Sequence, residues 1–184
     1  MIEQARDKIV AGIKGTGNIV QATVDTVAQI LATTIKDTGK VGTSVTDTIA
    51  DVASGAIRGA AQIGADLTQA AKGLMVGVLR GSKEAGRAVL DTISHTAQVA
   101  VRDTAKVGGN LEAAATGLVQ GAIQGAKELG VNAEDAAAAA ASGALKGAGE
   151  VGSTAVEAVR KAVGKPINGV KVAVKEPEAV VSAN

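Results

Sequence analysis

The chain has 184 residues, a formal net charge of +1 at pH 7, no cysteine, no aromatic residue and 24 glycines. The absence of cysteine excludes disulfides, thiolate metal sites and thiol nucleophiles. The near-neutral charge and the lack of aromatic rings exclude the basic excess and the stacking side chains that are typical of nucleic-acid binders.

The chain begins Met1-Ile2-Glu3-Gln4-Ala5-Arg6-Asp7-Lys8, where charged side chains interrupt every helical turn. This segment lacks the apolar core of a secretory signal peptide. The most apolar stretches, residues 73–79 and 113–123, are shorter than the roughly 20 apolar residues that a transmembrane helix needs. We therefore expect no conventional membrane span, and a location in the cytoplasm or at the periphery of a membrane or assembly.

One eight-residue segment recurs along the chain at a spacing of 22 residues. Residues Ile35–Gly42 return as Ile57–Gly64, and further copies begin at Leu79, Val101, Ile123 and Leu145. A related 11-residue half-unit lies between these copies, and an 11-residue period corresponds to three turns of a nearly straight α-helix. On a helical wheel the apolar positions form one arc and the charged positions lie opposite, which predicts an amphipathic helix.

The unbroken phase predicts an all-α chain, built as one long amphipathic helix or a helical hairpin of 11- and 22-residue repeats without a globular core. The repetitive helical region is expected over residues 1–163, followed by a short tail, residues 164–184, that contains Pro166 and Pro177. One continuous helix of that length would extend about 240 Å. Two segments are alternative sites for hairpin turns: Gly108-Gly109-Asn110 and Asn132.

Glycine destabilises a helix by roughly 1 kcal/mol relative to alanine, so recurrent glycines indicate close packing. One glycine in each 22-residue unit lies on the apolar arc, one helical turn after a small side chain, and such pairs let helix backbones approach closely. The predicted helix-packing residues are Gly42, Gly64, Gly86, Gly108, Gly130 and Gly152. A second series, on the flank of the arc, comprises Gly55/Gly59, Gly77/Gly81, Gly121/Gly125 and Gly143/Gly147.

The sign of the charge alternates between successive 11-residue half-units. The residues predicted to set the register between neighbouring helices are Asp25, Lys36, Asp47, Arg58, Arg80, Asp91, Arg102, Asp135, Lys146 and Glu157. Two helices shifted by one half-unit would place each basic side chain beside an acidic one. Exposed ion pairs contribute only about 0.2 to 1 kcal/mol each, so these charges would define register more than strength. The expected partner is the chain itself, as a homo-oligomer or polymer.

Two segments carry a resemblance to known families: residues 73–86, GLMVGVLRGSKEAG, and residues 117–130, GLVQGAIQGAKELG. They resemble the 11-residue repeats of synucleins and perilipins and the 22-residue repeats of exchangeable apolipoproteins. The resemblance implies amphipathic helices that fold on a lipid surface, which makes such a surface a second candidate partner.

No motif predicts catalysis, a cofactor or a metal site. Residues 147–152, GAGEVG, match the GxGxxG pattern of dinucleotide binding, but polyalanine precedes them where that motif needs a strand. His95 is the only histidine and is expected in solvent on a polar column. The recurrent carboxylates lie one half-unit apart along a helix, about 16 Å, which is too far for a two-carboxylate site.

The sequence thus favours a non-enzymatic structural protein that self-assembles by lateral helix packing into a filament, sheet or coat, with a lipid surface as a further partner. The alternative is a synuclein-like or phasin-like protein that covers a lipid or granule surface without ordered assembly. Neither hypothesis involves a cofactor, nucleic acid or a small-molecule substrate.

Overall fold

The computed structural model describes residues 1–38, 43–83 and 88–174, and helices make up most of them. The helices are α1 (Ile2–Thr16), α2 (Ile19–Thr38), α3 (Thr43–Gln62), α4 (Leu67–Gly81), α5 (Val89–Lys106), α6 (Leu111–Leu129), α7 (Ala133–Gly149) and α8 (Ser153–Val163). These described segments contain no strand, only one pair of bridged residues after α8. The chain is all-α, as predicted, but the prediction of one long helix or a single hairpin is wrong.

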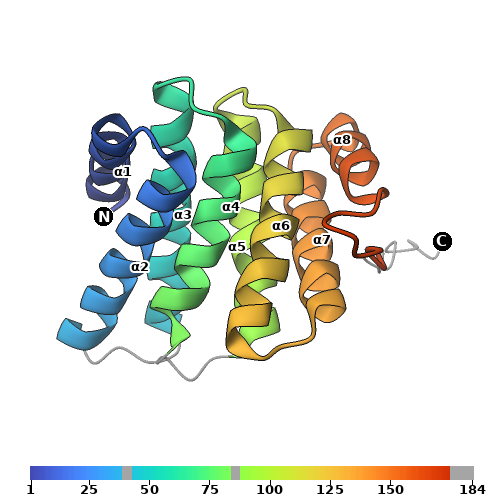
Figure 1. The fold of residues 1–184 in the computed structure, drawn as a ribbon. Coiled ribbons are helices and arrows are strands. Elements are labelled where there is room, and N and C mark those ends of the chain that lie inside the picture. The colour runs from blue at the N-terminus through green and yellow to red at the C-terminus, as the bar shows by residue number, and fades with distance from the viewer. Residues whose placement is uncertain (39–42, 84–87, 175–184) are drawn as a thin grey trace.

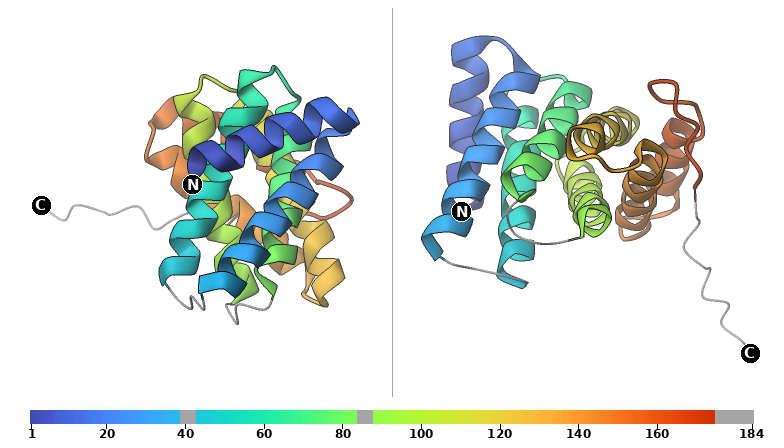
Figure 2. Two further views of the ribbon diagram at one scale, coloured as in Figure 1. Left: turned by 90° about the vertical axis from the view of Figure 1, so that its left-hand side faces the viewer. Right: turned by 60° about the horizontal axis from the view of Figure 1, so that its bottom comes forward.

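The helices form two layers, with successive helices alternating between them (Figure 1). Helices α1, α3, α5 and α7 make up one layer, and α2, α4, α6 and α8 make up the other. Within each layer, every helix packs against the helix two places earlier in the chain. The chain progresses along the stack (Figure 2), so α1 and α2 form one end and α7 and α8 form the other.

Left-handed glycines and capping side chains separate the helices. The φ angle lies between 65° and 72° at Gly17, Gly64, Gly108 and Gly130, and an α-helix ends where a residue adopts this conformation. Among the described residues, four helices begin after a residue whose side chain accepts a backbone N–H bond from the first turn: Asn18, Asp66, Asn110 and Asn132. The two alternative turn sites of the sequence, residues 108–110 and Asn132, are therefore turns.

The regular phase of the sequence did not exclude turns, because each turn fits inside the repeat. Helices α4, α5, α6 and α7 begin at residues 67, 89, 111 and 133, so their starts keep the 22-residue spacing. Each such interval holds a helix of 15 to 19 residues and the turn that follows it. Folding back buries the apolar arc within the chain, whereas one long helix would leave it exposed to water.

A hydrophobic core lies between the two layers, so the prediction of a chain without a globular core is also wrong. Its largest fully buried side chains are aliphatic and include Ile9, Leu31, Ile49, Leu74 and Leu118. Alanines of α7 complete it. Small side chains let the helices approach closely, which gives dense packing without aromatic rings. None of the helices in the described segments is both long and apolar enough to cross a membrane.

The segment after α8 extends the core at the end of the stack. Ile167 and Val170 exchange backbone hydrogen bonds of 3.0 and 2.9 Å. Between them Asn168 and Gly169 have φ angles of 49° and 76°, as a tight turn with both central residues in the left-handed region requires. Ile167 is buried, and the valines up to residue 174 pack against the core.

Candidate functional site

The predicted helix-packing glycines lie in turns rather than between helices. Gly64, Gly108, Gly130 and Gly152 have positive φ angles, and a β-carbon added at any of them would meet no atom within 4 Å. Gly42 and Gly86 lie outside the described residues. The predicted packing role is wrong for these four glycines. Their positions require a backbone conformation that glycine adopts without steric cost.

The second glycine series makes the close contacts. It lies on α3 against α1, on α4 against α2, on α6 against α4 and on α7 against α5. At Gly77, an added β-carbon would stand 2.8 Å from the Val27 Cβ and 2.9 Å from the Val24 carbonyl oxygen. Gly73 and Gly117, which belong to neither predicted series, make similar contacts one turn earlier. We call the glycine-bearing side of each of these helices its docking face.

Helix α5 lacks glycine at the corresponding positions. Val99 and Asp103 stand two repeat units after Gly55 and Gly59, and both are buried. Asp103 accepts a hydrogen bond from the Ser54 hydroxyl of α3. One of its carboxylate oxygens lies 3.4 Å from the Arg102 Nε and 3.7 Å from the Lys106 Nζ. Helix α5 packs on α3 less extensively than α7 packs on α5, so a polar contact replaces a close backbone approach there.

Two of the ten predicted register charges form ion pairs between described residues. Arg80 of α4 donates two hydrogen bonds of 2.8 Å to Glu128 of α6, and the Arg102 Nη1 lies 3.6 Å from a carboxylate oxygen of Glu150. Neither acidic partner belongs to the predicted series. The other eight predicted charges are exposed: Asp25, Lys36, Asp47, Arg58, Asp91, Asp135, Lys146 and Glu157.

The predicted pairing of helices shifted by one half-unit is therefore wrong for the folded chain. Successive helices fold back on each other in opposite layers, whereas the ion pairs that link different segments of the described chain join members of the same layer. Arg80 and Glu128 are 48 residues apart, as are Arg102 and Glu150, and Lys161 pairs with Glu112 across 49 residues at 3.3 Å. This spacing could not be seen in the sequence because it depends on how the hairpins stack.

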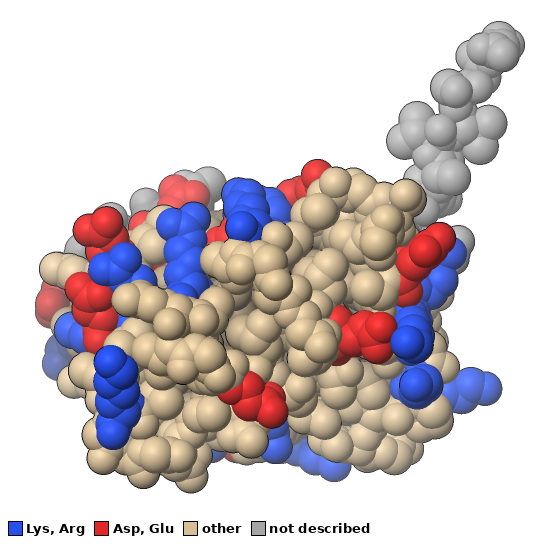
Figure 3. All heavy atoms as spheres, turned by 90° about the horizontal axis from the view of Figure 1, so that it is seen from above, with Lys and Arg blue, Asp and Glu red and all other residues tan. Residues whose placement is uncertain are grey.

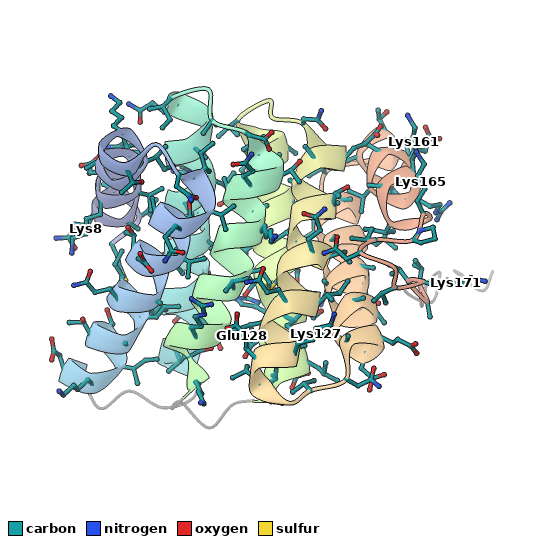
Figure 4. The ribbon with its side chains drawn as sticks, viewed as in Figure 1. Lys8, Lys127, Glu128, Lys161, Lys165 and Lys171 are labelled. Atoms are coloured by element: carbon teal, nitrogen blue, oxygen red, sulfur yellow. The ribbon has the colours of Figure 1, made fainter. Side chains whose placement is uncertain are left out.

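The Arg80–Glu128 pair shifts the pKa of both groups. Hydrogen bonds from the guanidinium lower the pKa of the Glu128 carboxyl below its ordinary value, and they outweigh the partial burial that would raise it. The same hydrogen bond to Glu128 raises the pKa of Arg80. Glu128 projects from α6 toward α4 (Figure 4). A two-pronged contact of this kind fixes orientation as well as distance, so it sets the register of α6 on α4.

The described residues contain no group of three His, Cys, Asp or Glu side chains that could hold a metal ion. His95 was expected in solvent, but it is partly buried on α5. The adjacent Ser94 is in contact with Gly143 of α7.

Two hollows lie at opposite ends of the stack. One, of about 310 Å³, lies between α1 and α2, and its lining includes Gln4, Lys8 and Thr33. The other, of about 360 Å³, lies on α7, and its lining includes Glu134 and Asp135. Lys8 projects away from the α1 end of the molecule (Figure 4). The charged side chain of the first hollow is thus basic, and those of the second are acidic.

The face seen from above carries a broad area without charged side chains (Figure 3). The turns that join α5 to α6 and α7 to α8 lie on this side (Figure 1). They contain Val107 and Val151, whose side chains are 38% and 48% exposed. Charged side chains gather mostly toward the edges of this face.

No protein-family model matches the chain, and a search of curated proteins finds no match. Function is therefore inferred from the structure of this chain itself, in particular from the recurrent docking faces and the two unlike ends.

Proposed function

We propose that this chain is a non-enzymatic structural protein, a stack of helical repeats with one helix per 22-residue unit, and that its copies self-assemble. Assembly would proceed by adding stack to stack at the ends, which gives a filament. The lateral packing inferred from the sequence then occurs inside each copy, between helices of one layer.

The observation that carries this proposal is the recurrence of the docking face. Helices α3, α4, α6 and α7 each present glycines to the preceding helix of the same layer, and all but α7 receive the following helix on another side. In repeat proteins of this kind each repeat contacts only the adjacent repeats, and the stack ends where a modified terminal repeat caps it. Two unlike end surfaces that fit each other form a head-to-tail contact, which produces an open polymer.

The non-enzymatic part of the proposal is supported by the composition of the surface. The two end hollows are lined mainly by alanine, threonine, glutamine and a few charged side chains. The described end surfaces offer small side chains and complementary charge, which suit protein binding.

The test is sedimentation velocity and electron microscopy of the purified chain over a wide concentration range, without lipid. Rods one molecule wide that lengthen with concentration support the proposal. A single monomer boundary at every concentration and ionic strength would exclude self-assembly.

A lipid surface is a second candidate partner, favoured by the exposed side chains of Val107 and Val151 and by the uncharged area on the same side of the molecule. The apolar arcs of the helices are buried in the fold, whereas these two valines can contact lipid without unfolding. Flotation with neutral vesicles tests this, with Val107→Asp and Val151→Asp combined as the variant. Equal flotation of the variant and the unmodified chain would remove this candidate.

A further inference from the structure

The first helix has a docking face that no described residue covers. The positions two repeat units before Gly55 and Gly59 of α3 are Ala11 and Gly15 of α1. With Gln4 and Lys8 they form one stripe along α1, and all four residues are exposed. A β-carbon added at Gly15 would meet no atom within 4 Å.

The same stripe is buried in the last helix of that layer. In α7 it consists of Ala136, Ala140, Gly143 and Gly147, all of which are buried. Gly143 lies on Ser94 of α5, and Gly147 lies on Gln98. In both cases the contacted residue is 49 positions earlier in the chain. Helix α1 therefore exposes a surface that α7 uses for packing.

The opposite end of the stack carries the surface on which such a stripe lies. The positions two repeat units after Ser94 and Gln98 are Ala138 and Ser142 of α7. Both are only partly buried, and both line the hollow that also contains Glu134 and Asp135. Helix α7 thus repeats the receiving side of α5 at a place where the described chain has no further helix in this layer.

We propose that a second copy of this chain docks its α1 on α7, in the register in which α7 docks on α5. This inference rests on the proposed self-assembly and names the surfaces that join. In this register Ala11 lies on Ala138 and Gly15 lies on Ser142. The contact continues an interface that the chain already forms within itself.

Charge complementarity supports the same register. In this register the two helices run in the same direction, as Gly143 on Ser94 and Gly147 on Gln98 do. Lys8 lies three positions before Ala11, and Asp135 lies three positions before Ala138, so Lys8 faces Asp135. Glu134 is its neighbour, and both carboxylates are exposed. A lysine at this position would be costly to bury against an apolar partner, but at this end it meets two acidic side chains.

The second layer gives a similar pairing. Gly121 of α6 lies on Lys72 of α4. The position four repeat units before Gly121 is Thr33 of α2, and the position four repeat units after Lys72 is Arg160 of α8. Docking in the same register therefore places Thr33 on Arg160. Asp37, one helical turn beyond Thr33, brings a carboxylate near that guanidinium.

The C-terminal segment must move before this contact can form. Ala173 lines the acidic hollow together with Asp135 and Ser142. Lys165 and Lys171 also lie at this end of the stack (Figure 4), where their charges repel Lys8 of an incoming copy. Residues 166–174 thus act as a cap on α7 that limits growth of the assembly.

The first experiment is a charge exchange in the full chain, read as the association constant from sedimentation equilibrium. Lys8→Glu alone and Asp135→Lys alone should each weaken association by about tenfold or more, because like charges then meet. The double variant should regain most of the association. Lys8 and Asp135 lie at opposite ends of one molecule, so recovery can come only from contact between copies.

The second experiment fills the docking face. Gly15→Leu should abolish association and leave the fold intact, since the site around Gly15 is open. Lys14→Leu is the matched control, because Lys14 is exposed on α1 but lies off the stripe, and it should associate like the unmodified chain. Val172→Asp, which loosens the cap, should strengthen association.

The outcomes separate this inference from the proposed function. Assembly that Gly15→Leu and both charge reversals leave unchanged would overturn the register and retain self-assembly. A discrete dimer that Gly15→Leu blocks but Asp135→Lys does not would mean that two α1 ends join, which also overturns it. A monomer in every variant, Val172→Asp included, would overturn both proposals.

Discussion

Replacing Gly143 by alanine tests the close packing of α7 on α5. The added β-carbon would overlap the Ser94 carbonyl oxygen and stand 2.8 Å from the Ser94 Cα. The obstacle is backbone, which cannot rotate away, so the overlap should cost about 1 to 3 kcal/mol. Helix propensity returns about 1 kcal/mol for Gly→Ala. The net expectation is a loss of up to about 2 kcal/mol in the free energy of unfolding.

Gly149→Ala is the matched control, because it makes the same chemical change on the same helix where the added carbon meets nothing within 4 Å. The propensity gain largely cancels between the two variants, so their difference isolates the overlap at about 1 to 3 kcal/mol. Urea denaturation followed by circular dichroism measures both free energies. Agreement of the two variants within about 0.5 kcal/mol would refute the close approach of these helices.

Three further predictions concern the ion pair, a helix cap and a turn. Because Arg80 lowers the pKa of Glu128, the pair stabilises the fold above the unfolded pKa of about 4.3, and this contribution is lost as pH falls through the folded pKa. Glu128→Gln should therefore lower stability at pH 7 by less than about 1 kcal/mol, since both side chains are about a third or more exposed. The difference should shrink as the pH falls below the unfolded pKa, and urea titrations at neutral and at acidic pH measure it. Asn132→Ala should cost about 1 kcal/mol, because its side chain accepts bonds of 2.8 and 3.0 Å at the start of α7; an unchanged urea midpoint would contradict this. Gly130→Ala should cost about 1 to 2 kcal/mol although its surroundings are open, since φ is 72° there, and a melting temperature at or above that of the unmodified chain would count against a left-handed turn.

Helix content and the apolar faces of the helices could be predicted from the sequence, whereas the number of helices could not. A helix and its turn together fill one 22-residue unit between α4 and α7, so the hydrophobic phase continues through the turns. Gly130 and Gly152 recur in the phase of the apolar arc, so the pattern alone predicts a packing role for them. A local signal that separates the two roles was present: Asn110 and Asn132 each follow such a glycine closely, which is typical of a turn that leads into a capped helix.

The partners of the charged residues could not be predicted because they depend on tertiary register. The 11-residue offset applies to straight helices lying side by side, but Arg80 of α4 reaches Glu128 on α6, beyond the whole of α5. The burial of Asp103 could not be predicted either. It looks like one more exposed carboxylate in the sequence, yet the stacking of α5 on α3 buries it against Ser54. The hollow that contains Lys8 is likewise formed by two helices that the repeat pattern shows only as one continuous phase.

The missing glycines of α5 have a mechanical consequence. One layer is interrupted between α3 and α5, where Val99 and Asp103 keep the backbones apart, while α2, α4 and α6 remain in close contact on the other side. We therefore expect uneven bending stiffness, because the looser contact between α3 and α5 should open more readily than the contacts of the other layer. A rod made of such molecules would flex at one joint per copy and always toward the same side, so its curvature would depend on the hydrogen bond from Ser54 to Asp103.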